Sequence, residues 1–154
     1  MTILMWVGII VGGILVLLLL PLIYYIVTGA AEPPEGIVLD VECPRVTSAG
    51  QPFDLVVTVR NQLDRERMFR SLDFDNSLLK GFTIDKIEPD PEDRSAAFGT
   101  TAYYYKLPMA PNASATFTLR CCAGTPGEYA GRTMVFVDKA HASFVAEPVK
   151  IVVK

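Results

Sequence analysis

The sequence predicts an all-β fold, an antiparallel β-sandwich of about seven or eight strands, preceded by one N-terminal transmembrane helix. Three observations lead to this expectation. Residues 1–31 contain no Asp, Glu, Lys or Arg. After residue 36, apolar side chains recur at every second position in several segments, as in strands with one buried face. Turn sequences rich in Pro, Gly and Asn separate these segments, which favours short antiparallel strands.

The N-terminal segment is the most apolar part of the chain, since nearly every residue from Ile3 to Val27 is apolar. A helix needs roughly 20 such residues to cross the bilayer core, where lipid offers no hydrogen-bond partner to the backbone. A cleaved secretory signal has a basic start and a shorter apolar core, whereas the first basic residue here is Arg45. Cleavage near residues 28–31 is the alternative. We expect residues 1–31 to be a retained membrane anchor.

Several residues of this anchor are of types that position a helix in a bilayer. Aromatic side chains near its two ends favour the membrane–water boundary, a proline in its last third is expected to kink the helix, and a glycine pair would allow a second helix to approach closely. These anchor positions are Trp6, Gly12, Gly13, Pro21, Tyr24 and Tyr25. Neither flank carries a nearby Lys or Arg, and acidic residues follow the segment, so we expect the C-terminal domain to lie outside the cytoplasm.

Residues 32–36 form a short linker, whose two prolines favour an extended, semi-rigid geometry. Residues 37–154 have the length of one domain. The formal net charge of the chain is −3, with acidic and basic residues interspersed. A nucleic-acid-binding surface would need a clustered basic face, so the charge pattern argues against that class of partner.

The alternation of apolar and polar residues places strands at 37–43, 53–59 and 115–121. Further strand candidates, separated by turn sequences, are 68–74, 82–87, 102–107, 129–137 and 149–153. Residues 78–81 are expected to form one helical turn that ends at Gly81. In the strand 102–107, the period of two puts Tyr103 and Tyr105 on one face and Tyr104 on the other.

Two groups of segments resemble a known family. The run Ala-Gly-Gln-Pro-Phe at 49–53, followed by Val-Thr-Val-Arg-Asn at 57–61, resembles the opening of immunoglobulin-like domains of bacterial and archaeal envelope proteins, such as the CARDB type. The runs 107–111, 116–119 and 124–129 are similar to the closing half of the same family. The resemblance implies an immunoglobulin-like sandwich with an adhesive or scaffolding role and no catalytic residues. Residues 62–70 depart from the family pattern, because a polar, charged stretch stands where a short turn is usual.

The three cysteines are the first candidates for chemistry. Counting by twos along their strands turns Cys43 and Cys121 inward and Cys122 outward. The inward pair can be small buried apolar residues, or Cys43 can form a disulfide with Cys121 or Cys122 in an oxidising compartment. A metal or redox site is a weaker alternative, since the chain has one histidine and no Cys-x-x-Cys spacing. The weak metal candidates are therefore Cys43, Cys121 and Cys122.

The charged residues offer weaker signals. Asp73 and Asp75 on one strand face, and the acidic residues of the predicted loop 88–93, supply oxygen ligands but lack a calcium-loop spacing. The basic residues between 65 and 70 indicate a solvated loop or a contact with a partner. His141 is expected in a surface turn, without a nucleophile to activate.

The leading hypothesis from the sequence is a non-enzymatic, single-pass membrane protein whose sandwich binds a partner protein outside the cytoplasm, as an accessory subunit of a membrane complex. The alternative is an envelope factor that handles a metal or a thiol through its cysteines. No cofactor and no small-molecule substrate are expected under the leading hypothesis.

Overall fold

The computed structural model describes residue 19 and residues 33–138 and 143–154. The domain described below belongs to the unit Glu32–Lys154. The predicted anchor positions Trp6, Gly12, Gly13, Pro21, Tyr24 and Tyr25 lie outside the described residues, as does His141. Within the described parts of the chain, no helix is long and apolar enough to span a membrane.

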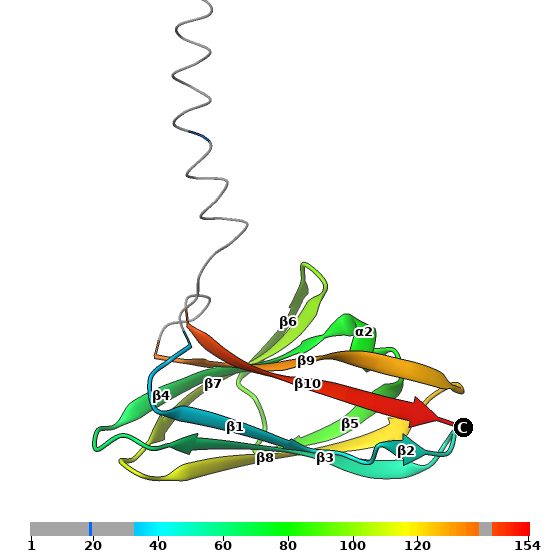
Figure 1. The fold of residues 1–154 in the computed structure, drawn as a ribbon, viewed down its shortest axis with the longest axis horizontal. Helices are drawn as coiled ribbons and strands as arrows, with labels where there is room; N and C mark the ends of the chain where they lie inside the picture. Colours follow the sequence, from blue (N-terminus) through cyan, green and yellow to red (C-terminus); the bar gives the residue numbers. More distant parts are fainter. Residues whose placement is uncertain (1–18, 20–32, 139–142) are drawn as a thin grey trace, which may run out of the picture. The chain divides into compact units, whose positions relative to one another are not determined.

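The domain consists of two β-sheets packed face to face (Figure 1). The first sheet has the order β1 (Ile37–Glu42), β3 (Pro52–Asn61), β8 (Ser114–Ala123) and β5 (Phe82–Glu88). The second has the order β2 (Val46–Thr47), β10 (Phe144–Val153), β9 (Gly127–Val137), β4 (Arg67–Asp75), β7 (Thr100–Met109) and β6 (Asp93–Ala97). Neighbouring strands pair antiparallel, except that β2 runs parallel to β10. The all-β sandwich predicted from the sequence is thus confirmed.

The strand order is that of an immunoglobulin-like sandwich. The first sheet matches the order A-B-E-D of such domains, and β10-β9-β4 matches G-F-C. The chain differs in placing β6 and β7 between β5 and β8, where they extend the second sheet beyond β4. All eight predicted strands are present, and two more appear: the two-residue β2 and β6, whose residues are all exposed.

The alternation read from the sequence produces the core between the sheets. Leu55, Val57 and Val59 of β3 are fully buried, as are Phe117 and Leu119 of β8. Their neighbours in sequence point to the outer face of the sheet, as the period of two requires. The same period holds in β7, where Tyr103 and Tyr105 are buried and Tyr104 is half-buried, as predicted.

The charged stretch after β3 differs from the prediction. The connection to β4 spans only residues 62–66, so the later part of the stretch is already strand. Arg67 is 7% exposed, where its Nε donates to Asp138 and its Nη1 donates to the carbonyl oxygen of Glu35 at 2.9 Å. Arg67 is therefore a buried structural residue and not part of a solvated loop, because its polar atoms find partners inside the fold.

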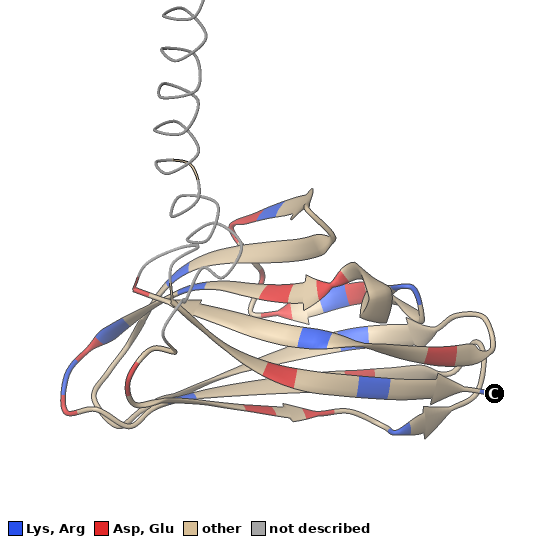
Figure 2. Cartoon of the chain, turned by 45° about the horizontal axis from the view of Figure 1, so that its top comes forward, with Lys and Arg blue, Asp and Glu red and all other residues tan. Residues whose placement is uncertain are grey.

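Two smaller expectations also need correction. The helical turn α2 (Asn76–Leu79) begins two residues before the predicted start and ends before Lys80, so Gly81 does not terminate it directly. The predicted acidic loop 88–93 is shorter than expected, because Glu88 ends β5 and Asp93 begins β6. Acidic and basic residues are spread over the strands and turns of the described domain, in agreement with the sequence (Figure 2).

The chain is held against the sandwich before β1 begins. Pro34 is buried, the carbonyl oxygen of Glu35 accepts from Arg67, and the carbonyl oxygen of Gly36 accepts from the amide of Gln62 at 2.7 Å. Gly36 has φ +66°, and a Cβ there would lie 2.5 Å from Cγ of Leu63. Only glycine combines this conformation with this close approach. The path of the chain is therefore fixed from Pro34 onward.

Candidate functional site

The cysteines occupy three different environments. Cys121 is 1% exposed in the core, whereas Cys122 and Cys43 are half-buried. This confirms the predicted register of β8, in which Cys121 faces inward and Cys122 does not. All three thiols are free. Among residues 33–138 and 143–154, no group of three His, Cys, Asp or Glu side chains could hold a metal ion.

Burial makes two of these thiols poor nucleophiles. It raises the pKa of Cys121 to about 12, with smaller contributions from the carboxylates of Asp85 and Asp54. Burial also raises the pKa of Cys43 above its ordinary value. Since the thiolate is the reactive and metal-binding form, neither side chain is prepared for chemistry at neutral pH.

We therefore expect the folded chain to be alkylated first at Cys122 and last at Cys121. At pH 8, Cys121 should react orders of magnitude more slowly than a free thiol, because it is both enclosed and protonated. Mass spectrometry of peptides after timed exposure to iodoacetamide measures the order, with a urea-unfolded sample as the control. Rapid labelling of Cys121 with slow labelling of Cys122 would contradict the register of β8.

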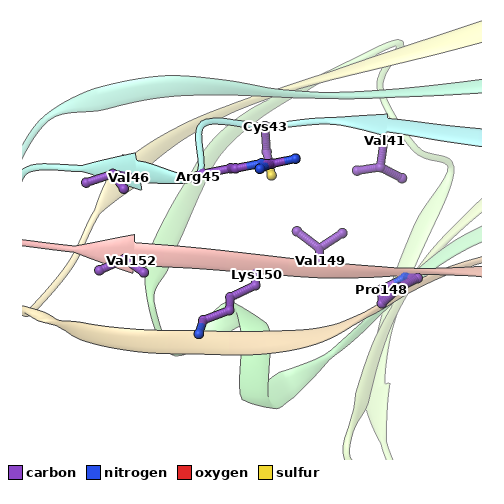
Figure 3. A pocket seen from close by; sticks show the side chains of 8 residues that line it. All are labelled: Val41, Cys43, Arg45, Val46, Pro148, Val149, Lys150 and Val152. Atoms are coloured by element: carbon purple, nitrogen blue, oxygen red, sulfur yellow. The ribbon is translucent and has the colours of Figure 1, made fainter.

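A groove opens on one flank of the sandwich, where the first strand changes sheets. β1 belongs to the first sheet and ends at Glu42, and β2 begins at Val46 beside β10 of the second sheet. The crossing leaves a cavity of about 500 Å³ between the two sheet edges (Figure 3). The lining side chains are Val41, Cys43, Arg45, Val46, Pro148, Val149, Lys150 and Val152.

The edge of β10 limits what can enter this groove. The amides of Val152 and Lys154 donate to the carbonyl oxygens of Arg45 and Thr47, both at 2.9 Å. By the alternation of the strand, the next two positions that face this edge are Lys150 and Pro148. Proline has no amide hydrogen, so Pro148 blunts the addition of a further strand. The groove is better suited to receiving side chains than to extending the sheet.

The charges around the groove are positive. Arg45 is exposed, and no acidic side chain of the described residues lies within ion-pair distance of it. The second cation, Lys150, is paired at 2.8 Å with Glu128, and both of these side chains are exposed. An apolar cleft beside a free guanidinium can hold an apolar side chain that stands next to a carboxylate.

The sequence did not identify this groove. Of its lining residues, the sequence pattern indicates only Cys43, and only as a metal ligand, a disulfide partner or a buried apolar residue. Pro44, which ends the alternation of the first strand, was the one local sign that the chain changes direction there. Two smaller hollows lie elsewhere, one of about 310 Å³ beside Tyr103 and one of about 280 Å³ beside Arg70.

No family model and no curated protein matches this sequence. Similar solved structures include AvmM, which catalyses macrocyclization in alchivemycin A biosynthesis; it is 11% identical, with a TM-score of 0.51 over 78% of this chain and 89% of that one. Escherichia coli alpha-2-macroglobulin is 12% identical with a TM-score of 0.48 over 77% of this chain, which spans only 7% of that protein. The CARDB domain of a Pyrococcus furiosus protein, in complex with di-metal ions, is 12% identical with a TM-score of 0.46 over 77% of this chain and 87% of that one. At these identities, the similarity concerns the fold alone.

Proposed function

We propose that this chain is a single-pass membrane protein whose β-sandwich lies outside the cytoplasm and binds a partner protein without catalysis, as an accessory subunit of a membrane complex. The apolar segment from Ile3 to Val27 supports the anchor, and the absence of Lys and Arg before Arg45 supports the orientation. The fixed path of the chain from Pro34 would hold the domain close to the bilayer.

The observation that carries the binding function is the groove beside β10. Its lining is mostly aliphatic, yet it opens to solvent between two sheet edges. The exposed fraction of Val46 is 52%, which is high for a large aliphatic side chain beside such a hollow. We propose that the partner supplies an extended segment with an apolar side chain for the cleft and a carboxylate for Arg45.

The alternative of a metal- or thiol-handling factor has less support. Cys121 is enclosed by the core, and the pKa of Cys43 in the groove is raised by burial. Both features disfavour the thiolate, which metal binding and thiol exchange require.

Site-specific cross-linking tests the proposed binding site. A photoreactive amino acid at Val46, in the full chain in its native membrane, should form an adduct with a partner protein. The same residue type at Val38 is the matched control, because Val38 is 43% exposed but lies on β1 outside the groove lining. Adducts at both positions, or at Val38 alone, would contradict the assignment of the site to the groove.

Charge reversal provides an independent measurement of the same site. Without a cross-linker, Arg45→Glu should weaken retention of the partner that the cross-link identifies, in mild detergent, on the order of tenfold, since it replaces attraction to a carboxylate with repulsion. Lys80→Glu is the control, because Lys80 is exposed and does not line the groove.

A membrane-impermeant protease added to intact cells or spheroplasts tests the proposed orientation. The protease should digest the domain, and protection of the domain from digestion until lysis would reverse the orientation.

A further inference from the structure

The β6–β7 hairpin carries an aromatic side chain at its tip. The two strands pair from Asp93–Tyr104 to Ala97–Thr100, which leaves Phe98 and Gly99 as the turn. Phe98 is fully exposed (106%), and every residue from 93 to 99 is exposed. Figure 1 shows this hairpin rising from the body of the sandwich. Nothing in the described domain therefore covers the ring.

Phe98 is an unfavourable residue for this turn. Phe98 has φ +50° and Gly99 has φ +81°. A two-residue hairpin turn with both central φ angles positive prefers Asn-Gly, and a bulky side chain in the left-handed region is strained. Because the ring is fully exposed, it also contributes no free energy of apolar burial to folding. The chain thus keeps a phenylalanine where both conformation and exposure act against it, and such an outlier points to a function for the side chain.

The surroundings of the ring indicate what it contacts. From Ser95 to Tyr105 the chain has no Asp, Glu, Lys or Arg. The charged residues of β6 lie at the base of the hairpin, and the tip is uncharged (Figure 2). A stable protein interface buries about 800 Å² on each partner, which one ring among Ala, Gly and Ser residues does not offer. The boundary of a lipid bilayer accepts a single aromatic ring on a small neutral tip.

The proposed anchor would keep the domain near the bilayer. The apolar segment ends at Val27, and the chain is fixed on the domain from Pro34. The six residues between them make seven Cα-to-Cα steps, which span at most about 25 Å when fully extended.

We infer that Phe98 inserts into the boundary between lipid headgroups and acyl chains of the membrane that holds the anchor. The hairpin gives the domain a second attachment point and fixes its orientation, so that the groove beside β10 faces a constant direction. This inference rests on the proposed membrane anchoring.

Tryptophan fluorescence in vesicles tests the contact, because the full chain has a single tryptophan, Trp6. The full chain is reconstituted in phosphatidylcholine vesicles with and without brominated acyl chains. Emission from Trp6 reports the anchor, and emission from the double variant Trp6→Phe, Phe98→Trp reports the hairpin tip. We expect blue-shifted emission that brominated lipid quenches in both chains. The control Trp6→Phe, Val46→Trp should not be quenched by brominated lipid.

A second reporter separates lipid contact from misfolding. Ala96→Trp in the Trp6→Phe chain places the probe beside the tip and leaves Phe98 in place. Adding Phe98→Asn should lower the ratio of lipid-bound to free tips by about 10- to 100-fold, since the buried ring is lost. The unfolding midpoint should stay the same or rise, because asparagine suits the turn.

The outcomes distinguish the inference from the proposal on which it rests. Quenching of Trp6 without quenching at position 98 overturns the inference and leaves the anchor in place. Failure of brominated lipid to quench Trp6 contradicts the anchor itself. A photoreactive amino acid at position 98 that forms adducts with a protein in native membranes, without quenching at this position in pure lipid, assigns Phe98 to a protein partner and also overturns the inference.

Discussion

Replacing Phe117 by alanine is expected to lower the free energy of unfolding of the sandwich by about 4 kcal/mol. Phe117 is fully buried at the centre of the core. Its ring stacks on Phe69, with centroids 4.5 Å apart, and meets the edge of Tyr105 at 5.0 Å. The substitution removes these contacts and leaves a cavity between the two sheets. The backbone of each sheet is held in place by the hydrogen bonds between its strands. The surrounding side chains can therefore relax only in part.

Phe98→Ala is the matched control, since it removes the same side chain from a fully exposed position. It should change the free energy of unfolding by less than about 0.5 kcal/mol. Urea unfolding of both full-length variants in mild detergent, followed by the circular dichroism of the strands, compares the two effects. Equal losses at the two positions would show that Phe117 does not lie in the core.

The strands of the core were predictable because each has one buried face. In β3 and β8, the apolar residues of the alternating sequence pattern are the side chains that are buried in the structure, at every second position. β6 and β2 lack this signal. β6 is exposed on both faces and pairs with β7 alone among the described strands, while β2 has two residues. A strand without a buried face leaves no period in the sequence.

The candidate groove could not be predicted, because it depends on contacts between distant segments. Its position follows from where β1 leaves the first sheet and β2 joins β10, which brings Arg45 beside the far end of the chain. The sequence pattern does not reveal the burial of Arg67 for a similar reason. Its partners Asp138 and Glu35 stand 71 and 32 residues away in sequence, so a run of local charges concealed a buried contact.

The role of Asn61 leads to the second large effect. Its Nδ2 donates to the carbonyl oxygens of Arg65 at 2.8 Å and Ala110 at 3.1 Å, and its Oδ1 accepts from the amide of Leu63 at 3.1 Å. The side chain is fully buried and joins the β3–β4 connection to the β7–β8 connection. Asparagine is the last residue of the Val-Thr-Val-Arg-Asn run that resembles the envelope domains. The amide therefore has a structural reason to stand there.

Asn61→Ala should lower the free energy of unfolding by about 3 kcal/mol, because it removes the hydrogen bonds that join the two connections and leaves the buried carbonyl oxygen of Met109 without this donor. Gln62→Ala is the control: Gln62 is the exposed neighbour, and its replacement should cost less than about 0.5 kcal/mol. A loss at Asn61 no larger than the loss at Gln62, in urea unfolding at pH 7, would contradict this account.

Asn61→Asp separates the donor from the acceptor function of this side chain. The new carboxyl keeps the shape and the acceptor for Leu63, but when ionised it faces the carbonyl oxygens of Arg65 and Ala110 without a donor. Burial and these oxygens disfavour the charged form, so the pKa of the carboxyl is raised in the folded state. The folded state then binds more protons than the unfolded state, and stability falls as pH rises from about 4, the unfolded pKa, up to the folded pKa. Unfolding curves of this variant and the wild type from pH 4 to 8 should diverge with increasing pH, whereas a pH-independent difference would show that the two donated hydrogen bonds do not carry the effect.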